Sequence, residues 1–399
     1  MQLSEEHRMF RKTLRDFLDN EIAGDVDELD KEEMSKEEAL DYIRSFGELG
    51  VGPASEGGLV DSLNDPMLYV LTAEEVCRTW VSLNVILGMS FPVMFMPWTA
   101  DETREAYDDR IESGELIGSM AVTEPDSGSD TKRPNTTAVR DGDEYVINGE
   151  KTWVSNAPIA DMALVVAYDE EEEQRDFFIV DQETSSFETQ SIHKLGWKAA
   201  PTGQMFFNDC RIPVENKLMN TVTRMLEESD DLSETPLSEE GIFAGEDPLN
   251  AIFAFMRTGM SAMAVGISQA ALDLALEYSQ QRETFGQPIA QHQLIQDKLY
   301  KIKEAVETSR QLTYHAAEKL SAGSDDVRMI SSLAKGHSCE KCVEATSEAL
   351  QVYGANGLST EYPIERFYRD ARMMTIPDGT TEIQKLIVGY ELTNMQAYQ

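Results

Sequence analysis

Positive charge is scarce in this sequence. Lys and Arg together number 34 against 73 Asp and Glu, so the 399-residue chain carries a formal net charge of −39. Without a basic surface a protein has nothing to meet phosphates, which argues against nucleic-acid binding and against an anionic membrane surface. A charge of this size repels itself at low salt, a balance that halophilic proteins use. We therefore expect a cytoplasmic protein of a salt-loving organism.

Cysteine is also scarce, with only Cys77, Cys210, Cys339 and Cys342. Four are too few for a disulfide scaffold and indicate a reducing compartment. Cys339 and Cys342 form a CxxC pair within a helix-like run that has no second pair, so helix packing is favoured over zinc or redox chemistry. The first twenty residues are charged throughout, and no signal peptide is expected.

Long uncharged runs are rare, and residues 79–100 are the main exception. The run is long enough to span a bilayer, but Pro92 and Pro97 interrupt it and its flanks show no excess of Lys or Arg. A buried helix that continues into a loop is the better prediction. The Met-rich composition fits plain core, and also fits an adaptable apolar pocket.

Hydrophobic spacing changes along the chain and predicts the domains. It is helical over residues 1–120, short and strand-like with turn signals over 121–218, and helical again over 248–399. Residues 219–247 are strongly acidic and aperiodic, which predicts an acidic insertion or linker. The sequence thus predicts an α+β protein with an N-terminal helical domain, a central antiparallel β domain and a C-terminal four-helix bundle. Asp141-Gly142 and Asn148-Gly149 predict hairpin turns.

Arg257 is the only charged residue between Asp247 and Asp273. A lone arginine on a buried helix needs an anionic partner, because an unpaired buried charge is costly. That partner is either a structural carboxylate or a ligand phosphate, and the spacing alone leaves both open.

Residues 376–384, IPDGTTEIQ, form the most unusual stretch. Pro377 and Gly379 bracket Asp378, which places its carboxylate on a turn. Thr380 or Thr381 caps the helix that follows, and the free N–H groups at its start suit an anionic oxygen or phosphate. The stretch is either an ordinary Asp-Gly turn or a carboxylate base held over a ligand. Residues 121–130 leave a similar choice, between a surface loop and hydroxyls that bind a polar heterocycle or phosphate.

Four stretches, in order, resemble the acyl-CoA dehydrogenase family. AVTEPDSGSD resembles its flavin loop, INGEKTWVSN a strand pair, RETFGQPIAQHQ its R-x-TFG segment, and QVYGANG…EYPIERFYRDAR…DGTTEIQ its C-terminal signature. The resemblance covers nearly the whole chain apart from the acidic insertion. It implies a helix–β–helix fold, bound FAD, a CoA thioester substrate and a role in fatty acid metabolism.

The resemblance also implies a reaction, the α,β-desaturation of an acyl-CoA. The carboxylate of Asp378 takes the α-proton, the β-hydrogen leaves as hydride to flavin N5, and electrons pass to an electron-transferring flavoprotein. The forming enolate oxygen needs stabilisation, which the family supplies with a flavin ribityl hydroxyl and the backbone N–H of the base residue. A homotetramer is expected, in which some cofactor contacts cross a subunit interface.

Carried over position by position, the resemblance implies two sets of residues. The cofactor-binding set is Thr123, Ser129, Trp153, Ser155, Arg282, Thr284, Phe285, Gln293, Gln351, Gly354, Ala355, Thr380 and Glu382. The substrate-binding set is Ser129, Arg257, Asp378 and Gly379, with Asp378 also catalytic. No metal site is expected.

The chain departs from the family pattern at the base. Asp378 stands where Glu is usual, Pro377 where Tyr is usual, and Gly354-Ala355 where Gly-Gly is usual. Aspartate is one methylene shorter, and a misplacement of about 1 Å can cost roughly a hundredfold in rate. The alternative base position of some members is Met256 here. Aspartate resembles branches such as the cyclic acyl-CoA dehydrogenases and nitroalkane oxidases. Two alternatives therefore stay open, a flavin oxidase of the nitroalkane type and a non-catalytic FAD-binding homologue.

We predict that stability depends on salt. The midpoint of thermal unfolding should rise by several degrees as KCl increases from about 0.1 M to 1 M, where the Debye length falls to about 3 Å. Differential scanning calorimetry measures this, with sucrose as an uncharged control that cannot screen charge. A midpoint that is flat in KCl would contradict the prediction.

Overall fold

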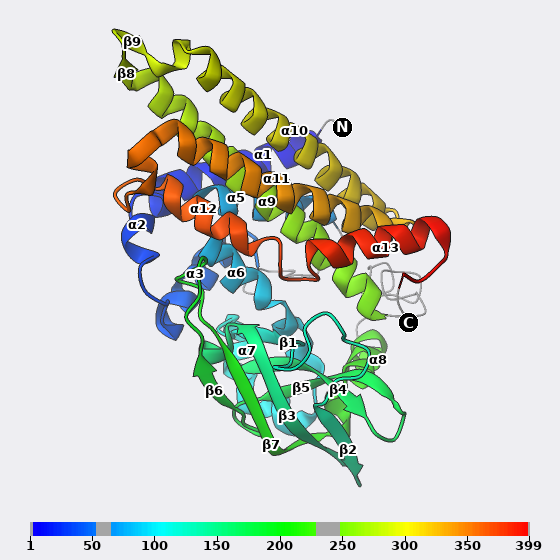
Figure 1. The fold of residues 1–399 in the computed structure, drawn as a ribbon. Coiled ribbons are helices and arrows are strands. Elements are labelled where there is room, and N and C mark those ends of the chain that lie inside the picture. The colour runs from blue at the N-terminus through cyan, green and yellow to red at the C-terminus, as the bar shows by residue number, and fades with distance from the viewer. Residues whose placement is uncertain (1–2, 53–64, 229–247, 398–399) are drawn as a thin grey trace.

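Helical and strand regions separate in the computed structural model, which describes residues 3–52, 65–228 and 248–397. The β domain packs on one side of the molecule and the long C-terminal helices on the other, with the N-terminal helices along both (Figure 1). The N-terminal helices are α1 Glu5–Phe17, α2 Val26–Leu29, α3 Lys36–Glu48, α5 Pro66–Thr79, α6 Val81–Met89 and α7 Asp101–Ser113, with a π-helical turn at Leu18–Ile22 and a 3-10 helix at Phe91–Trp98.

The starts of these helices follow from their sequence. Ser35 and Glu38 form a reciprocal capping box at the start of α3. Asp65 accepts the Met67 N–H ahead of α5, whose first residue is Pro66, where a missing N–H costs nothing. The predicted N-terminal helical domain is confirmed, and β1 begins at Gly118, inside the predicted range 1–120.

The strands form a mixed sheet rather than a purely antiparallel one. They are β1 Gly118–Ala121, β2 Thr137–Asp141, β3 Glu144–Ser155, β4 Met162–Asp169, β5 Gln174–Asp181, β6 Glu188–Ser191 and β7 Thr202–Pro213. Their order is β1-β4-β2-β3-β7-β6, and β5 also pairs with β4. β4 pairs in parallel with β1 and β2, while the other pairs are antiparallel. The prediction of an antiparallel domain missed these pairs, because the buried apolar run of β4 carries no signal for strand direction.

One of the two predicted hairpin turns is wrong. Asp141 pairs with Glu144, so the hairpin at Asp141-Gly142 is confirmed. Asn148-Gly149 instead lies inside the continuous strand β3, at a break in the pairing register with β7. Gly149 has φ +148°, and a Cβ there would come within 2.6 Å of Thr136 Oγ1. The glycine therefore serves a bulge and a close approach, which the same dipeptide does not distinguish from a turn.

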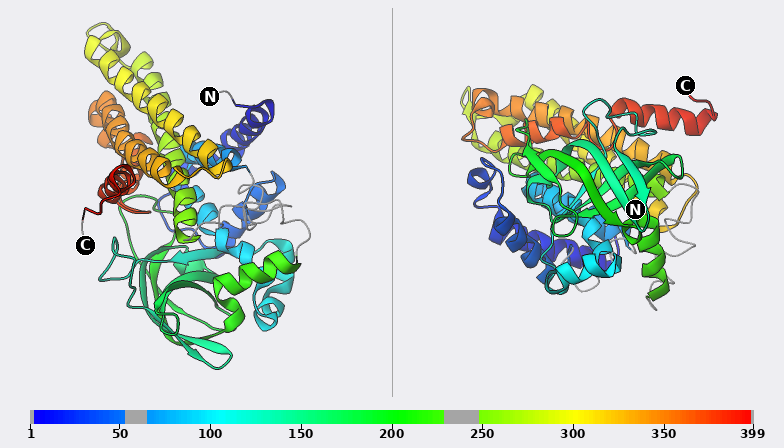
Figure 2. Two further views of the ribbon diagram at one scale, coloured as in Figure 1. Left: turned by 90° about the vertical axis from the view of Figure 1, so that its right-hand side faces the viewer. Right: turned by 90° about the horizontal axis from the view of Figure 1, so that it is seen from below.

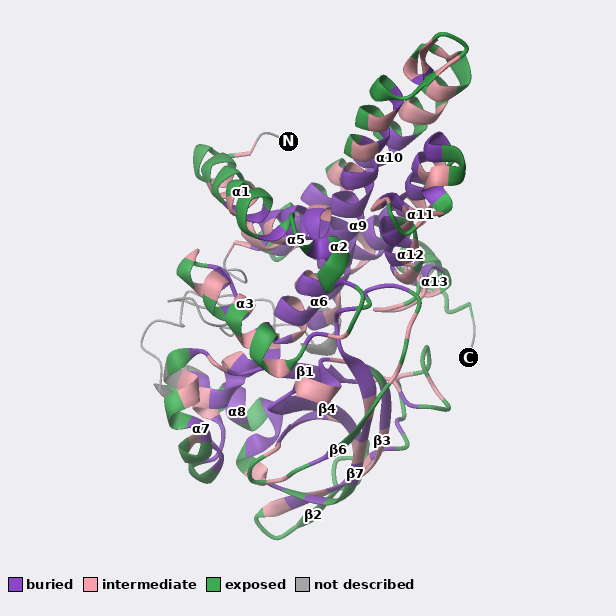
Figure 3. Ribbon diagram, turned by 90° about the vertical axis from the view of Figure 1, so that its left-hand side faces the viewer, coloured by how far each residue is buried: buried purple, intermediate pink, exposed green. Residues whose placement is uncertain are grey.

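The C-terminal bundle contains α9 Pro248–Gln281, α10 Gln293–Ser321, α11 Val327–Tyr353, α12 Ile364–Met373 and α13 Thr381–Thr393, and the short strands β8 Glu283–Thr284 and β9 Gln287–Pro288. Ser261 of α9 hydrogen-bonds Thr313 of α10 and Ser338 of α11, so three long helices meet at one buried polar point. The ends of α9 and α10 with β8–β9 project beyond the rest of the bundle (Figure 2), and this end is largely exposed (Figure 3).

The linker predicted over 219–247 needs a correction. α8 spans Leu218–Glu228, and its Val222 and Met225 are buried in an apolar cluster with Phe95. The helix was missed because the acidic composition of the whole stretch outweighed its apolar spacing. Residues 229–247 lie outside the described part of the chain. Gly354, which ends α11, has φ +61° and ψ −133°, a conformation outside the left-handed helical region.

Two apolar stretches, Val81–Trp98 and Ile252–Gln281, are long enough to cross a membrane by length and composition. Of the most apolar part of each, 61% and 78% are buried inside the protein, as in core helices. Cys339 and Cys342 are buried, unbridged residues of α11, in agreement with the prediction of helix packing.

A buried carboxyl pair joins the N-terminal helices to α12. Asp30 Oδ1 accepts hydrogen bonds from Trp80 Nε1 and Ser82 Oγ, and Asp370 Oδ1 accepts the Trp197 N–H at 2.7 Å. The Oδ2 atoms of both aspartates are buried without a partner in the described structure. Burial and the neighbouring Asp30 raise the pKa of Asp370 to about 7. Asp370 therefore holds a proton in the folded state at pH values where an unfolded aspartate has lost it.

We predict that Asp370 makes stability fall as pH rises from about 4 to 7, because the folded state then binds more protons than the unfolded state. The difference in unfolding free energy between Asp370→Asn and wild type should shift in favour of the variant by on the order of 2–3 kcal/mol between about pH 5 and 7.5. Urea unfolding at fixed high salt from about pH 5 to 7.5 measures it. The range stops there because burial lowers the pKa of nearby Lys194 to about 8. A difference independent of pH would refute the prediction.

Candidate functional site

The turn between α12 and α13 holds Asp378 in a fixed backbone shape. Asp378 has φ +54° and Gly379 φ +84°, so two successive residues adopt the left-handed region. Gln384 Nε2 donates to the carbonyls of Asp378 and Gly379 at 3.0 and 2.9 Å, and Lys335 Nζ donates to Gly379 O at 2.7 Å. Thr380 caps α13 by accepting the Ile383 N–H, which confirms one of the two predicted caps.

Asp378 is partly buried and lies among cations. Burial raises the pKa of its carboxyl group, while Lys335 and Arg257 act in the opposite direction. The pKa of Tyr69 is raised by burial and by the Asp378 carboxylate, which marks the phenol as a third neighbour. A carboxylate that is desolvated but flanked by positive charge is both more basic than one in water and able to stay ionised.

Arg257 is a buried cation with the features expected of a group that binds an anionic ligand. Its side chain is only 6% exposed, and its Nε and Nη1 atoms have no hydrogen-bond partner among the described residues. Burial and repulsion from Arg328 lower its pKa to about 10, while Asp378 acts to raise it. The guanidinium group also lies 5.4 Å from the ring of Phe253. Two unsatisfied buried donors beside a carboxylate leave room for an acceptor that the protein does not supply.

Tyr69 of α5 packs closely against α9 next to Asp378. Its ring stacks on Phe255 at a centroid distance of 4.1 Å. A Cβ on Gly259 would come within 1.9 Å of Tyr69 Oη, so only glycine allows the ring to occupy this place. The aromatic pair and the glycine together fix where Tyr69 lies relative to Asp378.

The β domain contributes a second group of predicted residues. Glu124 accepts the N–H groups of Asn135 and Thr136 and pairs with buried Lys151 at 2.8 Å, which ties the loop 122–136 to β3. Thr152 N donates to Thr123 O, so Thr123 lies beside the residue that precedes Trp153. Trp153 sits where the β3–β7 register shifts, has φ +59° and leaves 54% of its surface exposed. Ser155 ends the same strand.

Packing brings these two groups to the same junction. Val122, next to Thr123, packs in one apolar cluster with Phe253 and Met256, which flank Arg257 on α9. The segment joining α12 to α13 runs along the side of the bundle that faces the β domain (Figure 1). Ser129 is exposed on the loop 122–136, and Glu382 is exposed in the first turn of α13.

The remaining predicted residues lie at the other end of the bundle. Arg257 is near the start of α9 and Arg282 follows its end, so about 36 Å of helix separate them at roughly 1.5 Å per residue. Figure 1 places β8–β9 at the end of the bundle remote from the β domain. The α11 terminus lies beside this end, since Asn356 Nδ2 donates to Tyr278 Oη. The predicted residues at this remote end are Arg282, Thr284, Phe285, Gln293, Gln351, Gly354 and Ala355.

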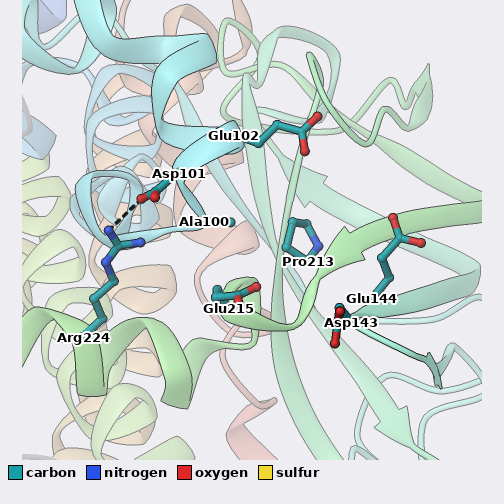
Figure 4. Close-up of a pocket in the computed structure, with 8 residues that line it drawn as sticks. All are labelled: Ala100, Asp101, Glu102, Asp143, Glu144, Pro213, Glu215 and Arg224. Atoms are coloured by element: carbon teal, nitrogen blue, oxygen red, sulfur yellow. Dashed lines mark hydrogen bonds and ion pairs between the residues drawn. The ribbon is translucent and has the colours of Figure 1, made fainter.

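One surface hollow of about 370 Å³ lies elsewhere, between α7, the β2–β3 turn and α8 (Figure 4). Five carboxylate side chains line it, and its single cation, Arg224, already pairs with Asp101 at 2.8 Å. None of the predicted site residues borders it, so we assign it no part in the site.

Three residues beside Asp378 were missed by the sequence reasoning, namely Tyr69, Lys335 and Gln384. Gln384 falls within the quoted C-terminal signature, but its side chain role depends on the turn's conformation. Lys335 had one usable signal, a lone cation within the uncharged segment SSLAKGHSC of α11. Tyr69 carries no signal, because an aromatic residue in an apolar helix is usually core.

The fold is a helix–β–helix arrangement, and the candidate site lies where the β domain meets the helical bundle. Family models match in order: acyl-CoA dehydrogenase N-terminal domain over residues 4–115, middle domain over 119–210 and C-terminal domain over 246–393. The chain belongs to the acyl-CoA dehydrogenase family. It is a flavoprotein oxidoreductase acting on acyl-CoA.

Relatives extend over the full length. The rat mitochondrial short-chain specific acyl-CoA dehydrogenase is 32% identical over 405 residues, covering 98% of this chain and 91% of the relative. A solved glutaryl-CoA dehydrogenase of Mycobacterium smegmatis in complex with FADH2 matches with a TM-score of 0.83 and 25% identity, over 100% and 97% of the chains. A structure described as the electron transferring flavoprotein of Acidaminococcus fermentans matches at 0.81 and 26%, over 99% and 100%.

We predict that Gly259→Ala destabilises the protein by about 1–3 kcal/mol, because the added methyl group forces Tyr69 from its place. Urea unfolding measures the cost. In a Tyr69→Ala background the same change should cost much less, which isolates the contact in a double-mutant cycle. Gly88→Ala is the matched control, since a helical glycine with open space should tolerate a methyl group. Equal costs with and without Tyr69 would rule the contact out.

Proposed function

We propose that the chain catalyses the α,β-desaturation of an acyl-CoA thioester with Asp378 as the base. The observation that carries this is the position of the carboxylate, desolvated on a clamped turn between Lys335 and Arg257 at the junction of bundle and β domain. Desolvation strengthens the base, and the two cations favour its ionised form at the start of the reaction. A structural Asp-Gly turn would need neither buried cation.

The residues present fit a flavin. Trp153 offers a half-exposed indole at a register shift of β3, Ser155 ends the same strand, and the Thr123 carbonyl accepts the Thr152 N–H. The N–H groups of Thr381 and Ile383 at the start of α13 already donate to Thr375 O and Thr380 Oγ1, so the free N–H groups predicted there are largely used, and the positive end of the helix dipole is what would favour a phosphate. Bound FAD would supply the two-electron acceptor that desaturation requires. Holding it is the role we assign to the cofactor-binding residues named from the sequence.

The chain's own part in the reaction is positioning and proton transfer. The carboxylate of Asp378 accepts the α-proton, and the backbone N–H of the turn stabilises the enolate oxygen as it forms. Arg257, with its unpartnered Nε and Nη1, binds a polar group of the CoA thioester near the reacting carbons. Apolar walls from Phe253, Met256 and Tyr69 keep water from the base.

A second copy of the chain would complete the cofactor site. Phe285 is 97% exposed on a turn with φ +52°, and it stands with Arg282 at the end of the bundle remote from Asp378. An exposed aromatic residue beside a cation is an unusual surface unless it is covered. We propose that these residues reach the cofactor of a neighbouring subunit in a homotetramer, and that an electron-transferring flavoprotein reoxidises the enzyme. The similar structure described as such a flavoprotein supports that pairing.

The setting we propose is the cytoplasm of a salt-adapted cell, with a role in fatty acid metabolism. The net charge of −39 and four unbridged cysteines support the setting, and the short-chain relative supports the role.

We predict that anaerobic mixing with one class of straight, branched or cyclic acyl-CoA bleaches the flavin absorbance of the wild-type protein in high salt. Asp378→Asn, which keeps the size of the side chain, should slow bleaching by about 10²–10⁴-fold, the usual contribution of a general base. Asp378→Glu is the matched control, because it keeps the carboxylate and tests reach alone.

Other outcomes would favour the alternatives. Bleaching by a nitroalkane with rapid reoxidation by oxygen would indicate an oxidase of the nitroalkane type. Bound FAD that no thioester or nitroalkane reduces would indicate a non-catalytic homologue. Asp378→Asn with wild-type rates would remove Asp378 as the base.

A further inference from the structure

Lys335 is a buried lysine that contacts no carboxylate among the residues the structure describes. Its side chain is completely buried on α11. Two other buried lysines each contact a carboxylate, Lys151 with Glu124 at 2.8 Å and Lys217 with Asp169 at 2.9 Å. Lys335 instead donates to a backbone carbonyl, that of Gly379, at 2.7 Å. Burying an ammonium group against a neutral acceptor is costly, so the contact calls for a functional reason.

The accepting carbonyl belongs to the turn that carries Asp378. Gly379 O accepts from both Lys335 Nζ and Gln384 Nε2, which uses its two lone pairs. Gln384 also donates to Asp378 O. Two side chains from two helices thus hold two consecutive carbonyls, in a turn whose residues both have positive φ.

The neighbouring residue on α11 makes this arrangement possible. A Cβ on Gly336 would lie 3.3 Å from Gln384 Cβ, closer than ordinary packing, so glycine lets α11 and α13 approach. The pair Lys335-Gly336 therefore brings the ammonium group beneath the turn and makes room for the glutamine that completes the clamp.

We propose that Lys335 is a positioning residue for Asp378: its ammonium group fixes the backbone of the turn and places a positive charge below the carboxylate. The inference rests on the proposed role of Asp378 as the base. It adds a residue that acts through the turn and does not itself touch the substrate.

The charges around the turn define what removing Lys335 should do. Asp378 faces Lys335 from α11, Arg257 from α9 and the phenol of Tyr69 from α5. Lys335 in turn interacts with Cys339, Arg257 and Glu382. With Lys335 neutral, only Arg257 opposes the effect of burial, so the pKa of Asp378 should rise. Less of the carboxylate is then ionised at a given pH, and the acid limb of the rate profile moves to higher pH.

The test compares Lys335→Met, which removes both the hydrogen bond and the charge, with Lys335→Gln, which keeps a donor but no charge. Lys341→Met is the matched control, a lysine of the same helix that pairs with Glu344 at 2.7 Å. Flavin reduction by the acyl-CoA that bleaches wild type is followed from about pH 5.5 to 9. Infrared difference spectra follow the carboxylic acid band of Asp378, identified by its loss in Asp378→Asn, and need no turnover.

Lys335→Met should reduce the rate by about 10–100-fold, with substrate affinity changed by less than about threefold, because the base is misplaced but the binding groups remain. The rate midpoint and the infrared midpoint should both move to higher pH. Lys335→Gln should recover part of the rate while keeping the shifted midpoints. Lys341→Met should match wild type.

Wild-type rate and midpoints in Lys335→Met would overturn the proposal. So would a loss of rate that tracks lost FAD and lowered melting temperature with no shift of the infrared midpoint, because that result describes a structural lysine. If Lys335→Met does not fold, an unshifted midpoint in Lys335→Gln overturns it, as does failure of both variants to fold. If no thioester bleaches wild type, the proposed function fails, but the infrared titration still decides whether Lys335 acts on Asp378.

Discussion

The arrangement around Asp378 depends on one physical constraint. A charged group that is removed from water must be stabilised by opposite charge or by hydrogen bonds. The carboxylate is desolvated, and Lys335 and Arg257 lie on the two long helices that face it. Each of the three would be costly alone, but together they offset much of one another's burial. The bundle can therefore hold an ionised carboxylate at this turn. Glycines permit the close contacts around it, Gly259 of α9 against Tyr69 of α5 and Gly336 of α11 against Gln384 of α13.

The same constraint divides the protein into a surface and an interior with different electrostatics. The surface carries most of a large acidic excess, whose self-repulsion salt would screen. Inside, the buried Glu74 and Glu75 are each met by arginines, among them Arg11 at 2.8 and 2.5 Å. Two of the buried cations, Lys335 and Arg257, have no carboxylate in direct contact within the described part of the chain, and both lie at the candidate site. The buried cations that do not pair with a carboxylate are thus found where we propose that the chemistry takes place.

What the sequence predicted well was local and periodic. Helical spacing predicted the two helical domains, and motif order predicted the family and which residues to inspect. Strand direction was not predictable, because the run that forms β4 reads the same in a parallel or an antiparallel pair. The dipeptides Asp141-Gly142 and Asn148-Gly149 look alike, yet one is a hairpin and the other a bulge beside Thr136. The roles of Tyr69 and Lys335 were not predicted, because they depend on which residues become their neighbours in the folded structure.

The resemblance places Asp378 where glutamate is usual, and for the proposed base this difference matters to the rest of the turn. A glutamate base has one more rotatable bond and can adjust its carboxylate without moving the backbone, whereas aspartate has only two side-chain torsions. The position of the Asp378 carboxylate is therefore set largely by the backbone, and an error in the backbone is passed on to the base almost in full. In a turn with two consecutive residues at positive φ, such errors are resisted by Lys335 and Gln384, which hold both carbonyls. A shorter base makes that rigidity more important, because reacting atoms must meet at about 3–3.5 Å.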